Sequence, residues 1–229
     1  MNPTAAEPIT SGDPNGDPQV LPLPNLPRTG RPTWEIACLY PNQGEWTEED
    51  YLALDANTNR MIELSDGCLE FLPMPGLIHQ FIARYVFEML VNFVREHGLG
   101  EVLFSPLPVR LWQGKIRVPD IMFFRPHRIK NRRKPPNGAD LAMEIVSEGK
   151  DARERDLETK RAEYAKAGIQ EYWIIDPELR QITVLVLDGQ VYREHGVFGP
   201  GTIASSVHLN GFSLSVDAVF AAGEGESSK

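Results

Sequence analysis

Two stretches determine the expected fold, RVPDIMFF at residues 117–124 and LAMEIV at residues 141–146. Each is largely apolar and contains one carboxylate, Asp120 in the first stretch and Glu144 in the second. Both stretches are predicted as buried strands, in which side chains alternate between the two faces of a sheet. A buried charge is costly unless it is paired, and a bound cation is a common partner. If the two strands are neighbours, the acids predict a site for a divalent cation.

A polar helix is predicted from about residue 152 to 167, ended by Gly168. Asp156, Lys160 and Tyr164 are spaced by four and therefore share one face of this helix. A lysine at that place can point back to the carboxylates and act on a metal-bound water or on a phosphate. Lysines on polar helices are also commonly solvated. Asp120 alone has a structural alternative, pairing with Arg117 or Arg125.

The other expected elements follow from apolar periodicity and turn residues. The order predicts an α/β fold with a mixed β-sheet flanked by helices, an added N-terminal hairpin and C-terminal strands. The elements are a helix at 48–54 capped by Thr47, a hairpin of 61–64 and 68–72 around Ser65-Asp66-Gly67, a long helix at 77–97, strands at 101–104, 108–112, 116–124, 139–146 and 171–176, and a hairpin of 181–187 and 190–194.

The net charge of −9 over 229 residues does not favour a nucleic-acid binder. Residues 125–134 nevertheless hold six basic side chains and no acidic one, which fits either a phosphate-binding loop or a flexible solvated loop. Cys38 and Cys68 lack metal-ligand spacing and favour free thiols in a reducing compartment. No signal-peptide core and no stretch long enough to span a bilayer is seen, so a cytoplasmic protein without membrane contact is expected.

Several motifs resemble the Uma-two family, which belongs to the PD-(D/E)XK nuclease superfamily with a restriction-endonuclease-like core. The likeness covers about residues 46–220. The residues that carry it are Val118-Pro119-Asp120, Glu144-Ile145-Val146-Ser147, Lys160, Tyr164, Gly168, Ile169 and the run from Tyr172 to Pro177, with looser support from Ile62 to Gly67 and from the His79 region. On this basis residues 33–222 are expected to form a single nuclease-like domain. Composition without an apolar period predicts a disordered Pro/Gly-rich leader at 1–32 and a disordered tail at 223–229.

The resemblance implies a role for each matching residue. Asp120 takes the place of the Asp in the Pro-Asp motif, and Glu144 takes the first place of the (D/E)XK motif. The third place is Val146 instead of lysine, and Lys160 looks like a replacement that enters from the helix. The implied catalytic residues are Asp120, Glu144 and Lys160, with Asp120 and Glu144 binding the metal, Mg²⁺ or alternatively Mn²⁺.

The implied function is an endonuclease that hydrolyses phosphodiester bonds in nucleic acid, with DNA as the expected substrate. The alternative is a catalytically inactive nuclease-like module that binds nucleic acid or protein, which the missing strand lysine and the acidic composition favour. A metal-dependent hydrolase of smaller phosphate esters is a third reading.

Three further residues are candidates for an accessory role. His79 could contact phosphate or metal, or could be a hydrogen-bonded histidine at a helix start. Glu63 and Glu70 could face the site, although a solvated hairpin face is the preferred reading for both. A homodimer is expected, with a face near Val184, Val186 and Val191, because dimers are the commonest closed assembly.

Overall fold

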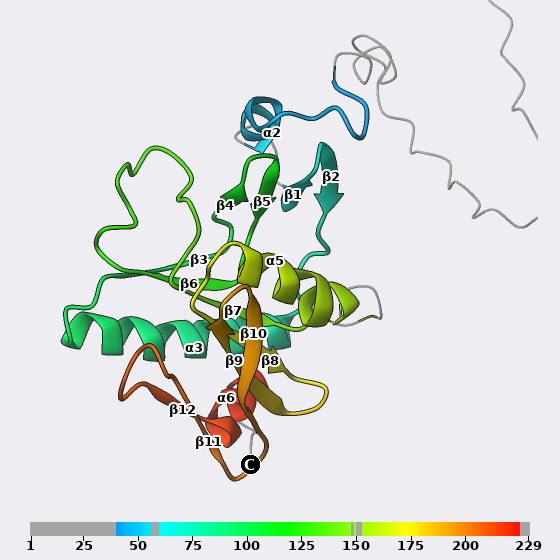
Figure 1. The fold of residues 1–229 in the computed structure, drawn as a ribbon. Coiled ribbons are helices and arrows are strands. Elements are labelled where there is room, and N and C mark those ends of the chain that lie inside the picture. The colour runs from blue at the N-terminus through cyan, green and yellow to red at the C-terminus, as the bar shows by residue number, and fades with distance from the viewer. Residues whose placement is uncertain (1–39, 56–59, 148, 150–152, 225–229) are drawn as a thin grey trace, which may run out of the picture. The chain divides into compact units, whose positions relative to one another are not determined.

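A computed structural model describes residues 40–55, 60–147, 149 and 153–224 (Figure 1). The predicted leader at 1–32 lies outside these ranges. The predicted tail begins at Gly223, but helix α6 (Val216–Glu224) continues past that residue, and 225–229 lie outside the described residues. The described residues from Pro41 onward belong to one compact unit.

The larger sheet has six strands in the order β10-β9-β8-β7-β6-β3. Strands β7 and β8 pair in parallel, whereas the other neighbours are antiparallel, so the predicted mixed sheet is confirmed. Its strands are β3 (Glu101–Phe104), β6 (Ile121–Phe124), β7 (Leu141–Ile145), β8 (Glu171–Asp176), β9 (Gln181–Asp188) and β10 (Val191–Phe198).

The smaller sheet has the order β2-β1-β5-β4 and contains the predicted hairpin. Asp66 and Gly67 both have positive φ angles, 50° and 82°, as the expected tight Asp-Gly turn requires. Helix α2 (Glu48–Asp55) precedes the hairpin, and Thr47 Oγ1 accepts a hydrogen bond from Asp50 N at 3.1 Å as its predicted cap. The strands are β1 (Ile62–Ser65), β2 (Cys68–Phe71), β4 (Val109–Trp112) and β5 (Lys115–Arg117).

The predicted strand at 116–124 is in fact two strands that belong to different sheets. Strand β5 ends at Arg117 in the smaller sheet, and β6 begins at Ile121 in the larger one. Pro119 has no N–H to donate to a ladder, and it restricts the residue before it, so the chain changes sheets here. Asp120 therefore lies in the connection just before β6 and not inside a buried strand.

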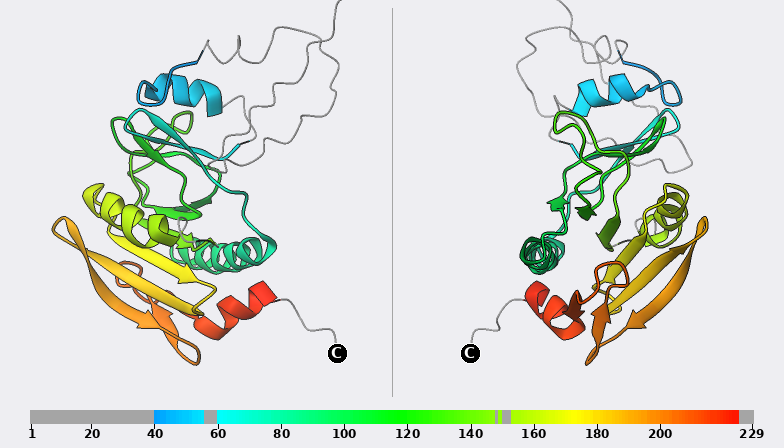
Figure 2. Two further views of the ribbon diagram at one scale, coloured as in Figure 1. Left: turned by 90° about the vertical axis from the view of Figure 1, so that its right-hand side faces the viewer. Right: turned by 60° about the vertical axis from the view of Figure 1, so that its left-hand side comes forward.

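Helices cover both faces of the larger sheet (Figure 2). On one face, helix α3 (Leu77–Glu96) buries Ile82, Val86, Leu90 and Val94 in a cluster that also includes α6. On the other face, Tyr164 and Ala165 of α5 (Lys160–Lys166) pack against residues of β6, β7 and β8. A π-helical turn, η1 (Arg155–Thr159), precedes α5 within the predicted helix. The two-stranded sheet of β11 (Ile203–Ser205) and β12 (Ser213–Ser215) completes the described residues.

Helix α3 departs from expectation in one respect. By length and composition alone it could cross a membrane, whereas no stretch of the sequence was expected to be long enough. A core helix of a soluble protein meets the same criterion, and α3 buries one face against the sheet. Its other side leaves Leu77, Ile78, Phe81 and Met89 exposed.

Candidate active site

A cavity of about 520 Å³ brings the three predicted catalytic residues together, since Asp120, Glu144 and Lys160 all line it. The residues come from the connection before β6, from β7 and from the first residue of α5. His79, in the first turn of α3, and Asp156, in η1, line the same cavity. Segments distant in the sequence therefore place two predicted metal ligands and a lysine around one space.

Asp120 is held beside Glu144 through the backbone. Its Oδ2 accepts a hydrogen bond from Ile145 N at 2.8 Å and lies 3.1 Å from His79 Nε2. The alternative pairing of Asp120 with Arg117 or Arg125 is not present among the described contacts. Within the described part of the chain both contacts of Asp120 use Oδ2, so Oδ1 is left for another partner.

Glu144 is almost fully buried, with 2% of its surface exposed. Its Oε2 lies 2.9 Å from Lys160 Nζ, and its Oε1 accepts a hydrogen bond from Tyr164 OH at 2.5 Å. Lys160 Nζ also lies 3.2 Å from Asp156 Oδ1. The spacing of four on the helix thus turns Lys160 into the site, and the reading of Lys160 as a solvated lysine is wrong.

The titrating groups show a surplus of negative charge. Burial raises the pKa of Glu144 to about 8, because the attraction of Lys160 is outweighed by burial together with the charges of Asp120 and Asp156. Burial opposes the charge of Lys160, but the surrounding carboxylates raise its pKa, so it stays an ammonium. Burial likewise disfavours the charged form of His79, yet its hydrogen bond to Asp120 raises the pKa. A divalent cation would relieve this surplus.

The residues fit a hydrated hard cation. Among the described residues, no three His, Cys, Asp or Glu side chains form a cluster that could hold a metal by themselves. Mg²⁺ does not need one, since it is commonly bound by one or two carboxylates and keeps several waters. Asp120, with Oδ1 free among the described contacts, and Glu144 supply two carboxylates on one cavity. The donor set therefore suits Mg²⁺ or Mn²⁺.

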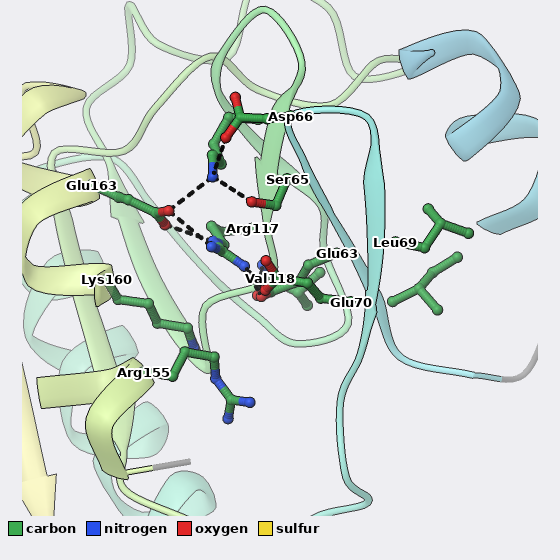
Figure 3. Close-up of polar contacts among 12 residues, drawn as sticks. Glu63, Ser65, Asp66, Leu69, Glu70, Arg117, Val118, Arg155, Lys160 and Glu163 are labelled. Carbon is green, nitrogen blue, oxygen red and sulfur yellow. Dashed lines mark hydrogen bonds and ion pairs between the residues drawn. The ribbon is translucent and has the colours of Figure 1, made fainter. Parts of the chain in front are cut away.

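The expectation of a solvated hairpin face is wrong for Glu63, which is fully buried. It accepts hydrogen bonds from Arg117 Nη1 at 2.7 Å and from Val118 N at 2.8 Å. Glu70 also binds Arg117 Nη1 and stays partly exposed (Figure 3). Neither glutamate lines the cavity, so the structure does not bring them to the site as accessory ligands.

Four residues in or next to the site make contacts that the sequence did not predict. They are Arg117, Glu163, Tyr164 and Asp156. Arg117 binds Glu163 through Nε at 2.6 Å and Nη2 at 2.9 Å, and Glu163 lies on α5 one turn after Lys160 (Figure 3). Tyr164 and Asp156 were expected only to share a helix face with Lys160. The spacing of four between residues 156, 160 and 164 was the sequence signal for Tyr164 and Asp156. No local sequence pattern marks the pairing of Arg117 with Glu163.

The basic run at 125–134 does not line this cavity. Arg128 Nε lies 3.1 Å from Asp140 Oδ1, and Arg132 Nη2 lies 3.2 Å from Glu101 Oε1. Part of its charge is therefore paired within the chain.

Comparisons with known proteins agree with this architecture. A family model described as "Putative restriction endonuclease", Uma2, matches residues 48–217. No curated protein matches the chain. A solved structure described as a "putative nuclease belonging to DUF820", from Anabaena variabilis ATCC 29413, is 21% identical with a TM-score of 0.65, over 78% of this chain and 99% of that chain. The predicted restriction-endonuclease-like fold is confirmed.

Proposed function

This chain belongs to the Uma2 (Uma-two) family, and from that premise we propose that it is a Mg²⁺-dependent endonuclease that hydrolyses phosphodiester bonds in DNA. The observation that carries the proposal is the single cavity lined by Asp120, Glu144 and Lys160. Mn²⁺ is the alternative cation. The family description and the description of the DUF820 structure support a nuclease in general terms.

Each residue has a role that its contacts support. Asp120 and Glu144 would hold the cation, and a bound cation supplies Lewis-acid chemistry and lowers the pKa of a coordinated water. Ile145 N and His79 orient Asp120, and Tyr164 OH orients Glu144. Lys160 stays protonated between Glu144 and Asp156, which suits it to stabilising charge on a phosphate and not to acting as a base.

A catalytically inactive binding module remains the second candidate. The observation in its favour is that Glu144 already has partners in Lys160 and Tyr164, while Val146 occupies the place of the usual strand lysine. A site of this kind can persist as a closed ion pair without any metal.

We also propose a cytoplasmic location and a homodimer, the commonest closed assembly. The expected dimer face needs a correction. Val184 is fully buried and Val186 is partly buried, so only Val191 of the three valines is exposed enough for a partner.

The decisive experiment replaces the two acids separately, Asp120→Asn and Glu144→Gln, and assays DNA cleavage with Mg²⁺ or Mn²⁺. Each change is expected to lower cleavage at least about a hundredfold, since it removes a carboxylate that would hold the cation. Isothermal calorimetry should show weaker Mg²⁺ binding. Asp140→Asn is the matched control, because Asp140 is also a buried carboxylate but lies outside the cavity.

Two results would decide against the proposal. Cleavage that survives both Asp120→Asn and Glu144→Gln rules out the mechanism. Absence of cleavage by the unmodified protein, together with Mg²⁺ binding that does not depend on Glu144, favours the inactive module.

A further inference from the structure

Apolar side chains make up much of the lining of the catalytic cavity. The segment at 72–75, Leu-Pro-Met-Pro, connects β2 to α3 and lines it, as do Phe87, Phe104 and Pro106. Met74 is 72% exposed and Phe104 is 57% exposed. Exposed apolar groups gathered beside a polar site are typical of a surface that binds a ligand or a macromolecular partner.

Phe104 is held in place with much of its side chain uncovered. It is the last residue of β3, the edge strand of the larger sheet. Phe87 of α3 packs against it edge-on, with ring centroids 4.8 Å apart and an interplanar angle of 68°. An edge-on contact covers at most one face of a ring, and Phe104 is more than half exposed, so it presents an open aromatic surface at the cavity.

Cationic groups line the same cavity. Arg84 and Arg155 do so together with Lys160, in a chain whose net charge is −9. The Arg84 side chain is 65% exposed, and its guanidinium lies 5.4 Å from the centre of the Phe81 ring. Phosphate-binding charge and an aromatic platform therefore occur side by side, which is the combination that binds single-stranded nucleic acid.

We propose that Phe104 stacks against an unpaired nucleobase, so that the preferred substrate is single-stranded or locally melted nucleic acid. The inference rests on the proposed nuclease function for the nature of the occupant. A cavity of about 520 Å³ falls in the range of pockets that take small ligands, and it can accept a nucleotide-sized group. Bases inside a duplex are stacked on one another and must be unstacked before they can contact the Phe104 ring.

The charge distribution agrees with a single strand. An intact duplex is bound mainly through many phosphate contacts from lysine and arginine. Here the one dense basic run, at 125–134, lies outside the cavity lining, and Arg128 and Arg132 within it are paired with Asp140 and Glu101. The cationic groups that line the cavity are few, and Arg84 and Arg155 pair with Glu88 at 3.9 Å and with Asp156 at 3.4 Å, so they can contact only a small number of phosphates.

The test measures binding without cleavage, by fluorescence anisotropy in EDTA at one fixed salt concentration. The probes are a labelled single-stranded DNA of about 12 nucleotides and a hairpin that carries the same sequence as duplex. Phe104→Ala is expected to weaken single-strand binding about tenfold, which is the usual effect of removing one stacking aromatic. Phe104→Trp should retain it. Phe71→Ala is the control, because Phe71 is 63% exposed but does not line the cavity.

Three results would overturn the inference: equal affinity for the hairpin, no measurable single-strand binding, or Phe104→Ala binding like the unmodified protein. A second copy of the chain is the other occupant that an apolar wall could take. Analytical ultracentrifugation tests this alternative. If Phe104→Ala dissociates a dimer and leaves DNA binding unchanged, the apolar lining around Phe104 is a self-association surface.

Cleavage assays in Mg²⁺ separate this inference from the proposed function. Phe104-dependent single-strand binding without cleavage removes the nuclease proposal and keeps the stacking site. Cleavage of single strand and hairpin at equal rates, unaffected by Phe104→Ala, keeps the nuclease and removes the stacking site.

Discussion

Two clusters of buried charge lie next to each other and differ in how their charges balance. The closed cluster consists of Glu63, Lys115, Arg117 and Glu163, and the open cluster consists of Asp120, Glu144, Asp156 and Lys160. In the closed cluster each buried acid is hydrogen-bonded by Arg117 or Lys115, and Glu70 and Asp66 pair with the same two bases from the more exposed rim. In the open cluster Glu144 and Asp156 share Lys160 at a cavity, while Asp120 lies beside His79. The same residue types thus give a structural brace in one place and a candidate active site in the other.

The pKa values express this difference. Burial disfavours the charge of Glu163, but hydrogen bonds from Arg117 and Lys115 lower its pKa. Glu144 has Lys160 beside it, yet its pKa is raised to about 8 by burial and by the neighbouring acids. A buried carboxylate with too little positive charge around it is a candidate ligand for a cation.

The closed cluster also supports the open one. Glu63 holds Val118 N, two residues before Asp120, and Glu163 lies on the helix that carries Lys160. Because Arg117 binds both glutamates, it ties the connection before β6 to α5.

The largest expected effect is on stability, from Arg117→Met. Among the described residues this change leaves Glu63 with no ion-pair partner, and loss of one member of a buried ion pair costs about 3–5 kcal/mol. Urea denaturation measures it. A loss below about 1 kcal/mol would mean that the closed cluster does not brace the fold.

Lys160→Met should have a smaller effect on stability and a large one on cleavage. Glu144 can take up a proton when its ammonium partner is removed, so we expect a loss of about 2 kcal/mol in the free energy of unfolding, smaller at pH 6 than at pH 8. Cleavage should fall about a hundredfold. If the stability loss equals that of Arg117→Met at both pH values, the two clusters do not differ as described.

The pH dependence of stability tests the open cluster directly. The pKa of Glu144 in the folded protein lies above its ordinary value of 4.5, so between about pH 4.5 and 8 the folded state binds more protons than the unfolded state. The free energy of unfolding of the metal-free protein should therefore fall as the pH rises through this range.

Glu144→Gln is the matched comparison for this prediction. Its stability should depend less steeply on pH, while the part due to His79, whose raised pKa acts in the same direction, should remain. Identical pH profiles for the two proteins would mean that Glu144 is ionised throughout.

The smallest effect is expected from Arg132→Ala. Arg132 pairs with Glu101 at 3.2 Å, but its side chain is 82% exposed, and such surface pairs are worth about 0.5 kcal/mol or less. Urea denaturation of Arg132→Ala and Arg117→Met in parallel compares the loss in unfolding free energy for an exposed ion pair with that for a buried one. A loss above about 1 kcal/mol would show that the basic run is more tightly structured than its exposure indicates.

The sequence by itself determined the features that depend on neighbouring residues. Apolar periodicity predicted α3 and the strands of the larger sheet, Asp-Gly predicted the turn between β1 and β2, and the spacing of four placed Asp156, Lys160 and Tyr164 on one face. The two acids of the cavity were also found in this way, because a carboxylate in an apolar stretch requires a partner, although Asp120 lies in the connection before β6 and not in a strand.

Only the tertiary structure decided which partner each charge has. The break of residues 116–124 between two sheets, the burial of Glu63 and the binding of Glu163 by Arg117 all depend on segments that are distant in the chain. Local patterns show that a side chain is charged and that its segment is apolar. Whether its charge is balanced depends on contacts that exist only after the sheets and α5 have packed together, and that balance distinguishes the brace from the candidate site.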